Sequence, residues 1–388
     1  MPRIYKILFL ASWYPTTEDP INGIFIERHA QSVSELCDVT VQSYHQVTID
    51  KNDFEYSEKN GIKIMRIYHR KTSSKNILVN NRVSECLTFL IKNYKAYKLI
   101  CKKDGKPDLI HLNVLHPMGL FAIFLHLIHN IPYIVTEHTS PFSIYYGSLI
   151  RKLGSILILK HARFILPVSA SLKREMQDLY DPDKYVIIPN IVNKNFFIGN
   201  LKHQNLQEKK NIIHVSLLND NQKNISGIID AVYEVSKKRD DFRLQIVGDG
   251  VDRKELEDLA EIYNILGTIV IFSGRLSDEE LLESYRNSCF FVLNSNHETF
   301  AIVCAEALAC GIPVISTRCG GPEEYIDGKM GLLIEINNHD QLVAAILHML
   351  DHYQDYDSTY LHDSIQSKFS SEIVGEKIFQ VYNRVLKE

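Results

Sequence analysis

Two glutamates in one segment have the spacing to grip a ligand that carries hydroxyls and negative charge. Glu298 and Glu306 are separated by seven residues in NSNHETFAIVCAEALACGIPV, which we predict to run as strand, turn and helix. A helix that begins near Phe300 or Ala301 would point its free N–H groups and positive dipole end at a phosphate. At about 1.5 Å per helical residue the carboxylates would lie roughly 10 Å apart. One could accept hydrogen bonds from sugar hydroxyls and the other from a ribose.

A purely structural interpretation of the same pair stands beside this one. Glu298 could cap the helix and Glu306 could be a solvated surface residue, and for two glutamates alone we would prefer that interpretation. The residues around Glu306 are small, however, with Ala305 and Ala307 on either side. They favour close packing, where a solvated carboxylate is not expected.

The elements that position these residues alternate along the chain between short β-rich runs and helical patterns. Such alternation predicts parallel βαβ units in an α/β fold. A polar stretch after YVIIPN has no sustained period and reads as a linker near 190–208. We expect strands at 6–11, 38–44, 62–67, 108–114, 132–138 and 164–169 before the linker, and at 211–218, 242–248, 268–274, 289–295 and 312–317 after it. The segment from 318 to the last residue is expected to be mostly helical.

Ligands of open parallel sheets bind beyond the carboxyl ends of the strands, where loops and helix amino termini converge. The candidates that follow a predicted strand are the loop to Gly23, His138, Gly248 and Glu298. Two come from each half of the chain, as expected if one ligand lies in a cleft between two domains. Gly248 opens GDGVDR, which lacks the third glycine of a dinucleotide fingerprint, so a nicotinamide enzyme is not indicated.

The second half resembles the retaining GT-B glycosyltransferases of family 4. Its motif is the pair Glu298 and Glu306, an Ala-rich helix, CGIPV, and a turn with Gly320, Gly321 and Glu324; LQIVGDGVDRKELEDLA and IFSGRLSDEELLESY follow the family order. The match runs in register over about 130 residues, which is far more specific than one motif. WYPTTEDPINGIFIERHAQSV and TEHTS match the family more weakly in the first half.

The resemblance implies a GT-B fold of two Rossmann-like domains facing a central cleft. It places an acceptor-binding domain at 1–195 and a nucleotide-sugar-binding domain at 208–370. It also implies that residues 371–388 form a helix that crosses back onto the first domain. Closure would then be a hinge motion about that crossing and the linker.

In the second domain the resemblance implies the donor-binding residues. Glu298 would hold the donor sugar, Glu306 the ribose hydroxyls and Lys223 the diphosphate, while backbone amides near Phe300 and Ala301 complete a phosphate cradle.

In the first domain, Gly23 would approach the donor phosphate and the acceptor, with Asn22 beside it. His138 would contact a hydroxyl of the donor sugar, whereas a lone histidine after a strand is more often structural.

Two departures from the family pattern bear on this assignment. The family carries an Arg where this chain has Leu217, and Arg275 is the candidate to replace that charge. The family also places glycines on both sides of the aromatic residue after the first Glu, where this chain has Thr299 and Ala301. Small residues there still allow the backbone to approach phosphate.

Composition limits the other classes of function. The formal net charge of -4 gives no overall attraction to nucleic acid, and the seven cysteines form no CxxC pair. There is no DxD motif at a strand end that would suggest a metal-held diphosphate, and the resemblance implies that no metal is needed. We expect no cofactor, with the nucleotide sugar as substrate. The start, MPRIYKILFLASWYP, is too short an apolar run for a signal peptide, so we expect a cytoplasmic location. The Lys-rich helix at 83–106 could rest on the inner face of an anionic membrane, with Lys92 among the lysines directed outward, or be simply solvated.

The prediction is a retaining, metal-independent hexosyltransferase. It would move a sugar from a nucleotide diphosphate to a glycan or lipid-linked saccharide, in cell-surface polysaccharide biosynthesis. Two alternatives stay open. One is a GT-B sugar-nucleotide epimerase or hydrolase, and the other is a non-catalytic two-lobed sugar-binding protein.

Overall fold

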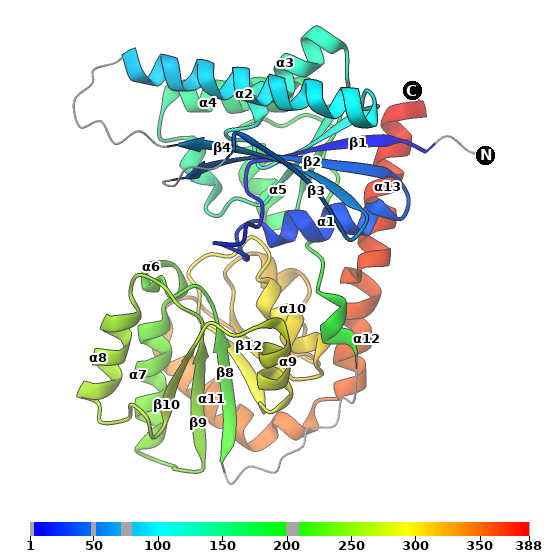
Figure 1. Cartoon of the computed structure of the whole chain (residues 1–388). Coiled ribbons are helices and arrows are strands. Elements are labelled where there is room, and N and C mark those ends of the chain that lie inside the picture. Colours follow the sequence, from blue (N-terminus) through cyan, green and yellow to red (C-terminus); the bar gives the residue numbers. More distant parts are fainter. Residues whose placement is uncertain (1–3, 48–51, 71–79, 199–208, 388) are drawn as a thin grey trace. The chain divides into compact units, whose positions relative to one another are not determined.

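The chain folds into two compact α/β units, seen in a computed structural model that describes residues 4–47, 52–70, 80–198 and 209–387. Unit 1 comprises Met1–Ile191 and Ser371–Glu388, and unit 2 comprises Val192–Ser370 (Figure 1). The expected linker lies partly outside the described residues. The chain passes from unit 1 to unit 2 between Ile191 and Val192, a few residues before the expected boundary at 195.

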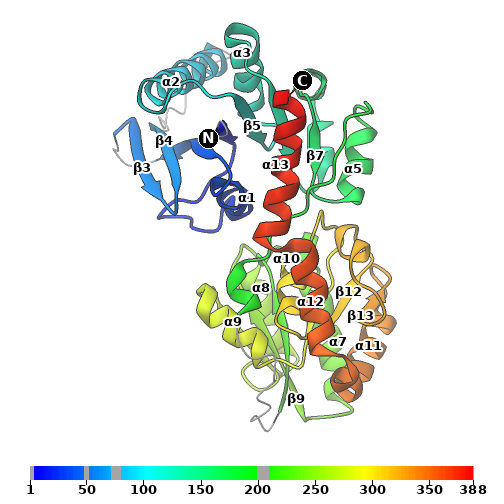
Figure 2. The same ribbon diagram turned by 90° about the vertical axis from the view of Figure 1, so that its right-hand side faces the viewer.

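Unit 1 is built on a seven-stranded sheet of order β3-β4-β2-β1-β5-β6-β7, parallel except for β3. Helices α2, α3 and α4 cover one face and α1 and α13 the other (Figures 1 and 2). Its strands and helices are β1 (Lys6–Ala11), α1 (Ile24–Ser34), β2 (Asp38–Val47), β3 (Phe54–Lys59), β4 (Ile62–Arg70), α2 (Asn80–Asp104), β5 (Leu109–Asn113), α3 (Gly119–His129), β6 (Tyr133–Glu137), α4 (Leu149–His161), β7 (Ile165–Pro167), α5 (Ala170–Gln177) and α13 (Ser371–Lys387).

Strand β3 was not expected from the sequence. It pairs with β4 in an antiparallel hairpin closed by Asn60 and Gly61, whose φ angles are 52° and 76°. Two central residues with positive φ make the type I′ turn that matches the twist of a hairpin, and Asn-Gly is its preferred pair. That dipeptide was the signal in the sequence that could have predicted the strand.

The last helix, α13, packs in unit 1 against α1, as the resemblance implies. Gly375 permits this contact, because a Cβ there would lie 2.4 Å from the carbonyl oxygen of Ser32. The Tyr382 hydroxyl and His111 Nδ1 lie 2.7 Å apart and join the helix to strand β5. The final residues of the chain therefore complete the core of the unit in which the chain begins.

Unit 2 contains a fully parallel six-stranded sheet of order β10-β9-β8-β11-β12-β13. Every expected strand is present, but the stretch after β12 is not entirely helical, because Gly331–Ile334 forms β13 on the edge of the sheet. The strands and helices are β8 (Lys210–Val215), α6 (Asp220–Lys223), α7 (Ile225–Ser236), β9 (Phe242–Val247), α8 (Arg253–Ile262), β10 (Val270–Gly274), α9 (Asp278–Arg286), β11 (Phe290–Leu293), α10 (Ile302–Ala309), β12 (Val314–Thr317), β13, α11 (His339–His352) and α12 (Ser358–Phe369).

Each sheet has a point at which the strand order reverses. In unit 1 the order reverses between β1 and β5, and in unit 2 between β8 and β11. Loops that leave neighbouring strands there diverge to opposite faces and open a crevice at the carboxyl edge. Among the helices of the described segments, none combines the length and hydropathy that crossing a bilayer requires.

Candidate functional site

A lysine–glutamate ion pair lies at the reversal point of the unit 2 sheet. Lys223 follows β8 and Glu298 follows β11, and Lys223 Nζ lies 2.6 Å from Glu298 Oε1. Ser295 Oγ donates a second hydrogen bond to the same oxygen, at 2.8 Å. The lysine and glutamate side chains are 17% and 10% exposed. The residue proposed for the donor sugar and the residue proposed for the diphosphate are therefore in direct contact.

Two loops are tied together to hold this pair. Asn296 donates from its backbone N to the carbonyl of Gln222 at 2.9 Å, and from its side chain to the carbonyl of Asn221 at 2.9 Å. Asn294 donates to the carbonyl of Asn224, the left-handed residue that ends α6. The loop after β11 thus fixes the short helix that carries the lysine. Sequence reasoning missed these amides, whose partners lie about 70 residues away.

Helix α10 begins four residues after Glu298, and no side-chain hydrogen bond caps its amino end. The first helical N–H groups lack partners within the helix, so an uncapped end can receive an anion. Ala301 occupies the N-cap position in the left-handed conformation, with φ 57°. That conformation costs a residue with a Cβ about 1–2 kcal/mol and costs glycine little, which is a physical reason for glycine at this place in the family.

The backbone of this turn is held in place by the residues that pack against it. The Phe300 ring is buried against Tyr325 and Phe369, so Phe300 offers only its backbone to a ligand. A Cβ on Gly321 would lie 2.5 Å from the carbonyl oxygen of Thr299. The Gly-Gly turn of the motif thus serves as a close-packed support for residues 299–300.

The interpretation of Glu298 as a helix cap is wrong, because α10 has no side-chain cap.

Glu306 lies in α10 and is only 4% exposed. The solvated interpretation of this residue is therefore wrong, and the small neighbours Ala305 and Ala307 are fully buried. A buried carboxylate one helical turn inside an uncapped helix can accept hydrogen bonds, because an ionised carboxylate offers four acceptor positions.

Three further positions singled out in the sequence lie at the same carboxyl edge of the unit 2 sheet. Gly248 follows β9 with φ 133°, and a Cβ there would lie 1.8 Å from the carbonyl oxygen of Ser216, so no side chain fits. Leu217 is 57% exposed and supplies no charge. Arg275 follows β10, is exposed, and pairs with no side chain in the described part of the chain. Gly248 N donates to the carbonyl of Gly274, next to Arg275, at 2.8 Å.

In unit 1, Gly23 is the left-handed N-cap of α1, with φ 76°. A Cβ on Gly23 would lie 2.6 Å from the carbonyl of Trp13, so the loop after β1 depends on glycine for its close backbone approach. Asn22 is exposed and lines a cavity of about 500 Å³ at the carboxyl ends of β1 and β2. Its other lining residues are mostly polar or aromatic: Ser12, Trp13, Tyr14, Thr16, Glu18, Asp19, Tyr44, His45, Gln46, Val47 and Tyr68.

His138 follows β6 and is buried, with its ring 4.3 Å from Phe25 and 5.4 Å from His29. Burial lowers the pKa of His138 well below its usual range, and the neighbouring His29 lowers it further. The imidazole is therefore neutral at pH 7. A neutral imidazole can donate one hydrogen bond and accept one, which suits a hydroxyl rather than a phosphate.

A residue that sequence reasoning missed holds this histidine. Glu137 is fully buried and accepts from the backbone N of His138 and of Thr139, both at 2.8 Å, from the Thr139 hydroxyl at 2.6 Å and from the backbone N of Leu115 at 3.0 Å. Burial raises the pKa of Glu137, and these four hydrogen bonds act in the opposite direction. Glu137 therefore joins the loops after β5 and β6 and sets the position of His138.

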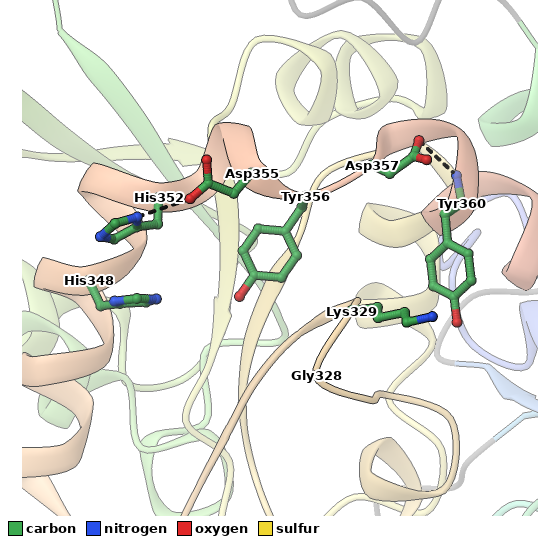
Figure 3. A pocket seen from close by; sticks show the side chains of 8 residues that line it. All are labelled: Gly328, Lys329, His348, His352, Asp355, Tyr356, Asp357 and Tyr360. Atoms are coloured by element: carbon green, nitrogen blue, oxygen red, sulfur yellow. Dashed lines mark hydrogen bonds and ion pairs between the residues drawn. The ribbon is translucent and has the colours of Figure 1, made fainter.

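A hollow of about 450 Å³ in unit 2 lies away from Lys223 and Glu298. Lys329 comes before β13 and His352 ends α11, so the hollow lies toward the amino ends of the strands, opposite the edge of Lys223 and Glu298. Figure 3 shows His348 and His352 stacked on one helix, and Tyr360 beside Lys329. The lining residues are Gly328, Lys329, His348, His352, Asp355, Tyr356, Asp357 and Tyr360.

In the described segments, no cluster of three or more His, Cys, Asp or Glu side chains has the arrangement of a metal site.

The fold and the site define the class of GT-B glycosyltransferases. The chain has two Rossmann-like units, a C-terminal helix that belongs to the first unit, and an uncapped helix amino terminus where the strand order of the unit 2 sheet reverses. The solved structure of Anabaena HepE in complex with UDP and glucose superimposes with a TM-score of 0.72. It is 14% identical, and the alignment covers 98% of this chain and 100% of that one. The likeness establishes the fold.

Sequence comparison then gives the family. Residues 30–196 match the profile described as Glycosyltransferase Family 4, and residues 199–360 match Glycosyl transferases group 1. An uncharacterised glycosyltransferase of Methanocaldococcus jannaschii is 29% identical over 350 residues, which cover 90% of this chain and 89% of that protein. A Bacillus subtilis protein named as a teichuronic acid biosynthesis glycosyltransferase is 25% identical over 98% of this chain and 99% of its own length. The chain belongs to the glycosyltransferases of the group 1 and family 4 type.

Proposed function

We propose that this glycosyltransferase transfers a hexose, with retention of configuration and without a metal, from a nucleotide diphosphate to a glycan or lipid-linked saccharide. The observation that carries the proposal is the Lys223–Glu298 pair beside the uncapped end of α10. A cation, a carboxylate and free helix N–H groups within one loop cluster are the groups that a sugar diphosphate requires. The proposed place of action is cell-surface polysaccharide biosynthesis, as the name of the Bacillus subtilis relative suggests for that protein.

The donor assigns a role to each group. Lys223 would release Glu298 and bind the diphosphate, while Glu298 would turn to the hydroxyls of the sugar. The N–H groups near Thr299, Phe300 and Ala301 would hold the phosphates, and Glu306 the ribose. HepE, a protein of the same fold, was solved in complex with UDP and glucose, which supports a nucleotide sugar as the donor here.

Bond breaking would be driven by charge on the leaving diphosphate. As the bond from the sugar carbon to the phosphate oxygen lengthens, negative charge grows on that oxygen, and Lys223 and the helix terminus stabilise it. Arg275 and the backbone at Gly248 would support the diphosphate from the adjacent strands. The acceptor hydroxyl would attack from the face that the diphosphate leaves and would lose its proton to it, so no covalent sugar–enzyme intermediate is assigned.

Unit 1 would bind the acceptor. The cavity beside Asn22 carries the aromatic rings and hydrogen-bonding groups that bind saccharides, and Gly23 lets the backbone approach. His138, neutral and oriented by Glu137, would contact a sugar hydroxyl. We further propose that the enzyme acts in the cytoplasm at the inner face of the membrane, where lipid-linked acceptors are found.

The test is a panel of nucleotide sugars assayed first by thermal shift. A donor at one hundred times its dissociation constant should stabilise the protein by about 2.7 kcal/mol. The donor that binds is then supplied in labelled form with saccharide acceptors, and products are separated. Transfer of label with the anomeric configuration retained supports the proposal. Free sugar as the only product indicates a hydrolase, and an altered sugar still attached to nucleotide indicates an epimerase.

Glu298→Gln should abolish transfer while the fold persists, because the variant keeps the volume of the side chain and loses its charge. Glu261→Gln is the matched control, since Glu261 is an exposed glutamate on α8 of the same unit. Full activity in Glu298→Gln would show that the carboxylate of Glu298 has no role in the site.

A further inference from the structure

Helices α3 and α4 of unit 1 present apolar side chains to solvent where a surface helix usually carries polar ones. Ile150 is 84% exposed and Leu149 71% on α4, while Leu127 is 63% and Ile128 62% exposed on α3. Single exposed leucines are common, but a contiguous group of large ones marks an interaction surface.

The exposed side chains form one ridge, because the two helices pack closely. A Cβ on Gly119 would lie 2.5 Å from the Ile158 side chain, so α3 and α4 meet at these positions. Leu120 and Leu157, both 44% exposed, stand beside this contact. From there α3 continues for nine residues to Ile128, about 14 Å, and α4 extends back for eight residues to Ile150, about 12 Å. We call it the α3–α4 ridge.

The charged side chains on α3 and α4 are of one sign. Neither helix contains an acidic residue, and Arg151, Lys152 and Lys160 are exposed on α4. The α2 helix lies next to α3 through a Tyr94–Phe124 ring contact of 5.6 Å. It adds the exposed residues Lys95, Lys98 and Lys102, and its exposed acidic residue, Glu85, lies nine residues before Tyr94.

The lysine face of α2 is a weaker surface than the sequence predicts. Lys92 does not project outward; its amine donates to Asp53 at 2.6 Å and to the Tyr68 carbonyl at 3.0 Å. Lys103 lies over the Tyr56 ring, 3.4 Å from its centroid. The expectation that Lys92 is directed outward was therefore wrong, and the apolar ridge is the more pronounced feature.

We infer that the α3–α4 ridge binds the surface of a bilayer that contains anionic lipids, with its leucine and isoleucine side chains inserted among the acyl chains. An apolar stripe flanked by basic and lacking acidic side chains is the pattern of helices that lie in a membrane interface, where lysine and arginine meet the headgroups. The inference rests on the proposed membrane-side location and not on the transfer chemistry.

The experiment is sedimentation of the full chain with vesicles of phosphatidylcholine alone and with phosphatidylglycerol added, in the absence of any sugar. The chain should bind the anionic vesicles at least tenfold more tightly, and raising the salt should weaken the binding because exposed charges are screened. No binding to either vesicle, or equal binding to both, would overturn the inference. Because no donor or acceptor is present, this result is independent of the transferase assay.

Ile150→Glu should reduce the vesicle affinity at least tenfold. The matched control is Ile262→Glu, since Ile262 is 73% exposed on α8 of unit 2 and the charge change is the same. Equal affinity in the two variants would overturn the inference. Sedimentation velocity without vesicles checks the other occupant: a dimer that Ile150→Glu dissociates, together with no vesicle binding, would assign the ridge to a second copy of the chain.

Discussion

Removing the positive charge of Lys223 should destabilise unit 2 and weaken the binding of a nucleotide diphosphate together. Glu298 is left with only the Ser295 hydroxyl among the donors described above. Breaking a fully buried ion pair costs about 3–5 kcal/mol, and an exposed pair about 0–1 kcal/mol. At 17% and 10% exposure the Lys223–Glu298 pair lies nearer the buried limit, so we expect Lys223→Met to cost about 2–3 kcal/mol.

A double-mutant cycle with Glu298→Gln isolates the interaction. If the loss comes from an unpaired carboxylate, the double variant should be about 2 kcal/mol more stable than the sum of the single changes predicts. Urea unfolding is followed by circular dichroism. The single tryptophan, Trp13, lies in unit 1, so its fluorescence reports a unit that the changes do not touch. Glu234 and Lys237 form the control pair, with the same 2.6 Å separation but side chains 44% and 47% exposed, and should show no measurable coupling.

A coupling within about 0.5 kcal/mol of zero would refute the reasoning, because independent sites add to within that margin. Ligand binding gives a second measurement on the same variants. Lys223→Met should weaken the affinity for a nucleoside diphosphate far more than for the nucleoside, since the lysine is assigned to the phosphates. An equal loss for both ligands would remove Lys223 from that role.

Three further outcomes follow from the described geometry. Burial lowers the pKa of His214 to about 4, below its unfolded value near 6.5, so as pH falls from 6.5 to 4 the unfolded state takes up the proton first. The contribution of His214 to the free energy of unfolding should be fully present above pH 6.5 and about 3 kcal/mol smaller at pH 4. In urea unfolding, His214→Gln should lose stability less steeply than the unaltered chain as pH falls over this range only. Gly23→Ala should unfold unit 1 at lower urea than Gly61→Ala, read by Trp13 fluorescence. Both glycines have φ 76°, but a Cβ at Gly23 would lie 2.6 Å from backbone and at Gly61 no atom is closer than 3.8 Å, so equal midpoints would contradict the steric argument. Ala301→Gly should keep full transfer and Ala301→Val should lose it, because a β-branched residue is disfavoured at φ 57°. The measurement is the rate of sugar transfer with saturating donor, and an active valine variant would argue against the left-handed turn.

The alternation of strands and helices could be predicted from hydrophobic periodicity, and the strand at Lys6–Ala11 begins and ends where the sequence places it. Strand β13 could not, because four residues opened by Gly331 carry too little pattern to distinguish a strand from a helix end. In the site, the glycine-dependent turns at Gly23 and Gly248 were predictable as loops after strands. The backbone contacts that exclude a side chain at each were not.

The sequence by itself determined the classes of element, the residues that follow the strands and the family resemblance, because these depend on local patterns and motif spacing. Only the tertiary structure decided that Lys223 contacts Glu298, 75 residues away, since it depends on β8 and β11 being neighbours. It also decided that Glu306 is buried, that Glu137 holds the loop of His138, and that apolar residues of α3 and α4 face solvent. Exposure and pairing of a side chain depend on which elements pack together. That packing depends on many contacts between residues far apart in the sequence, which must be mutually compatible.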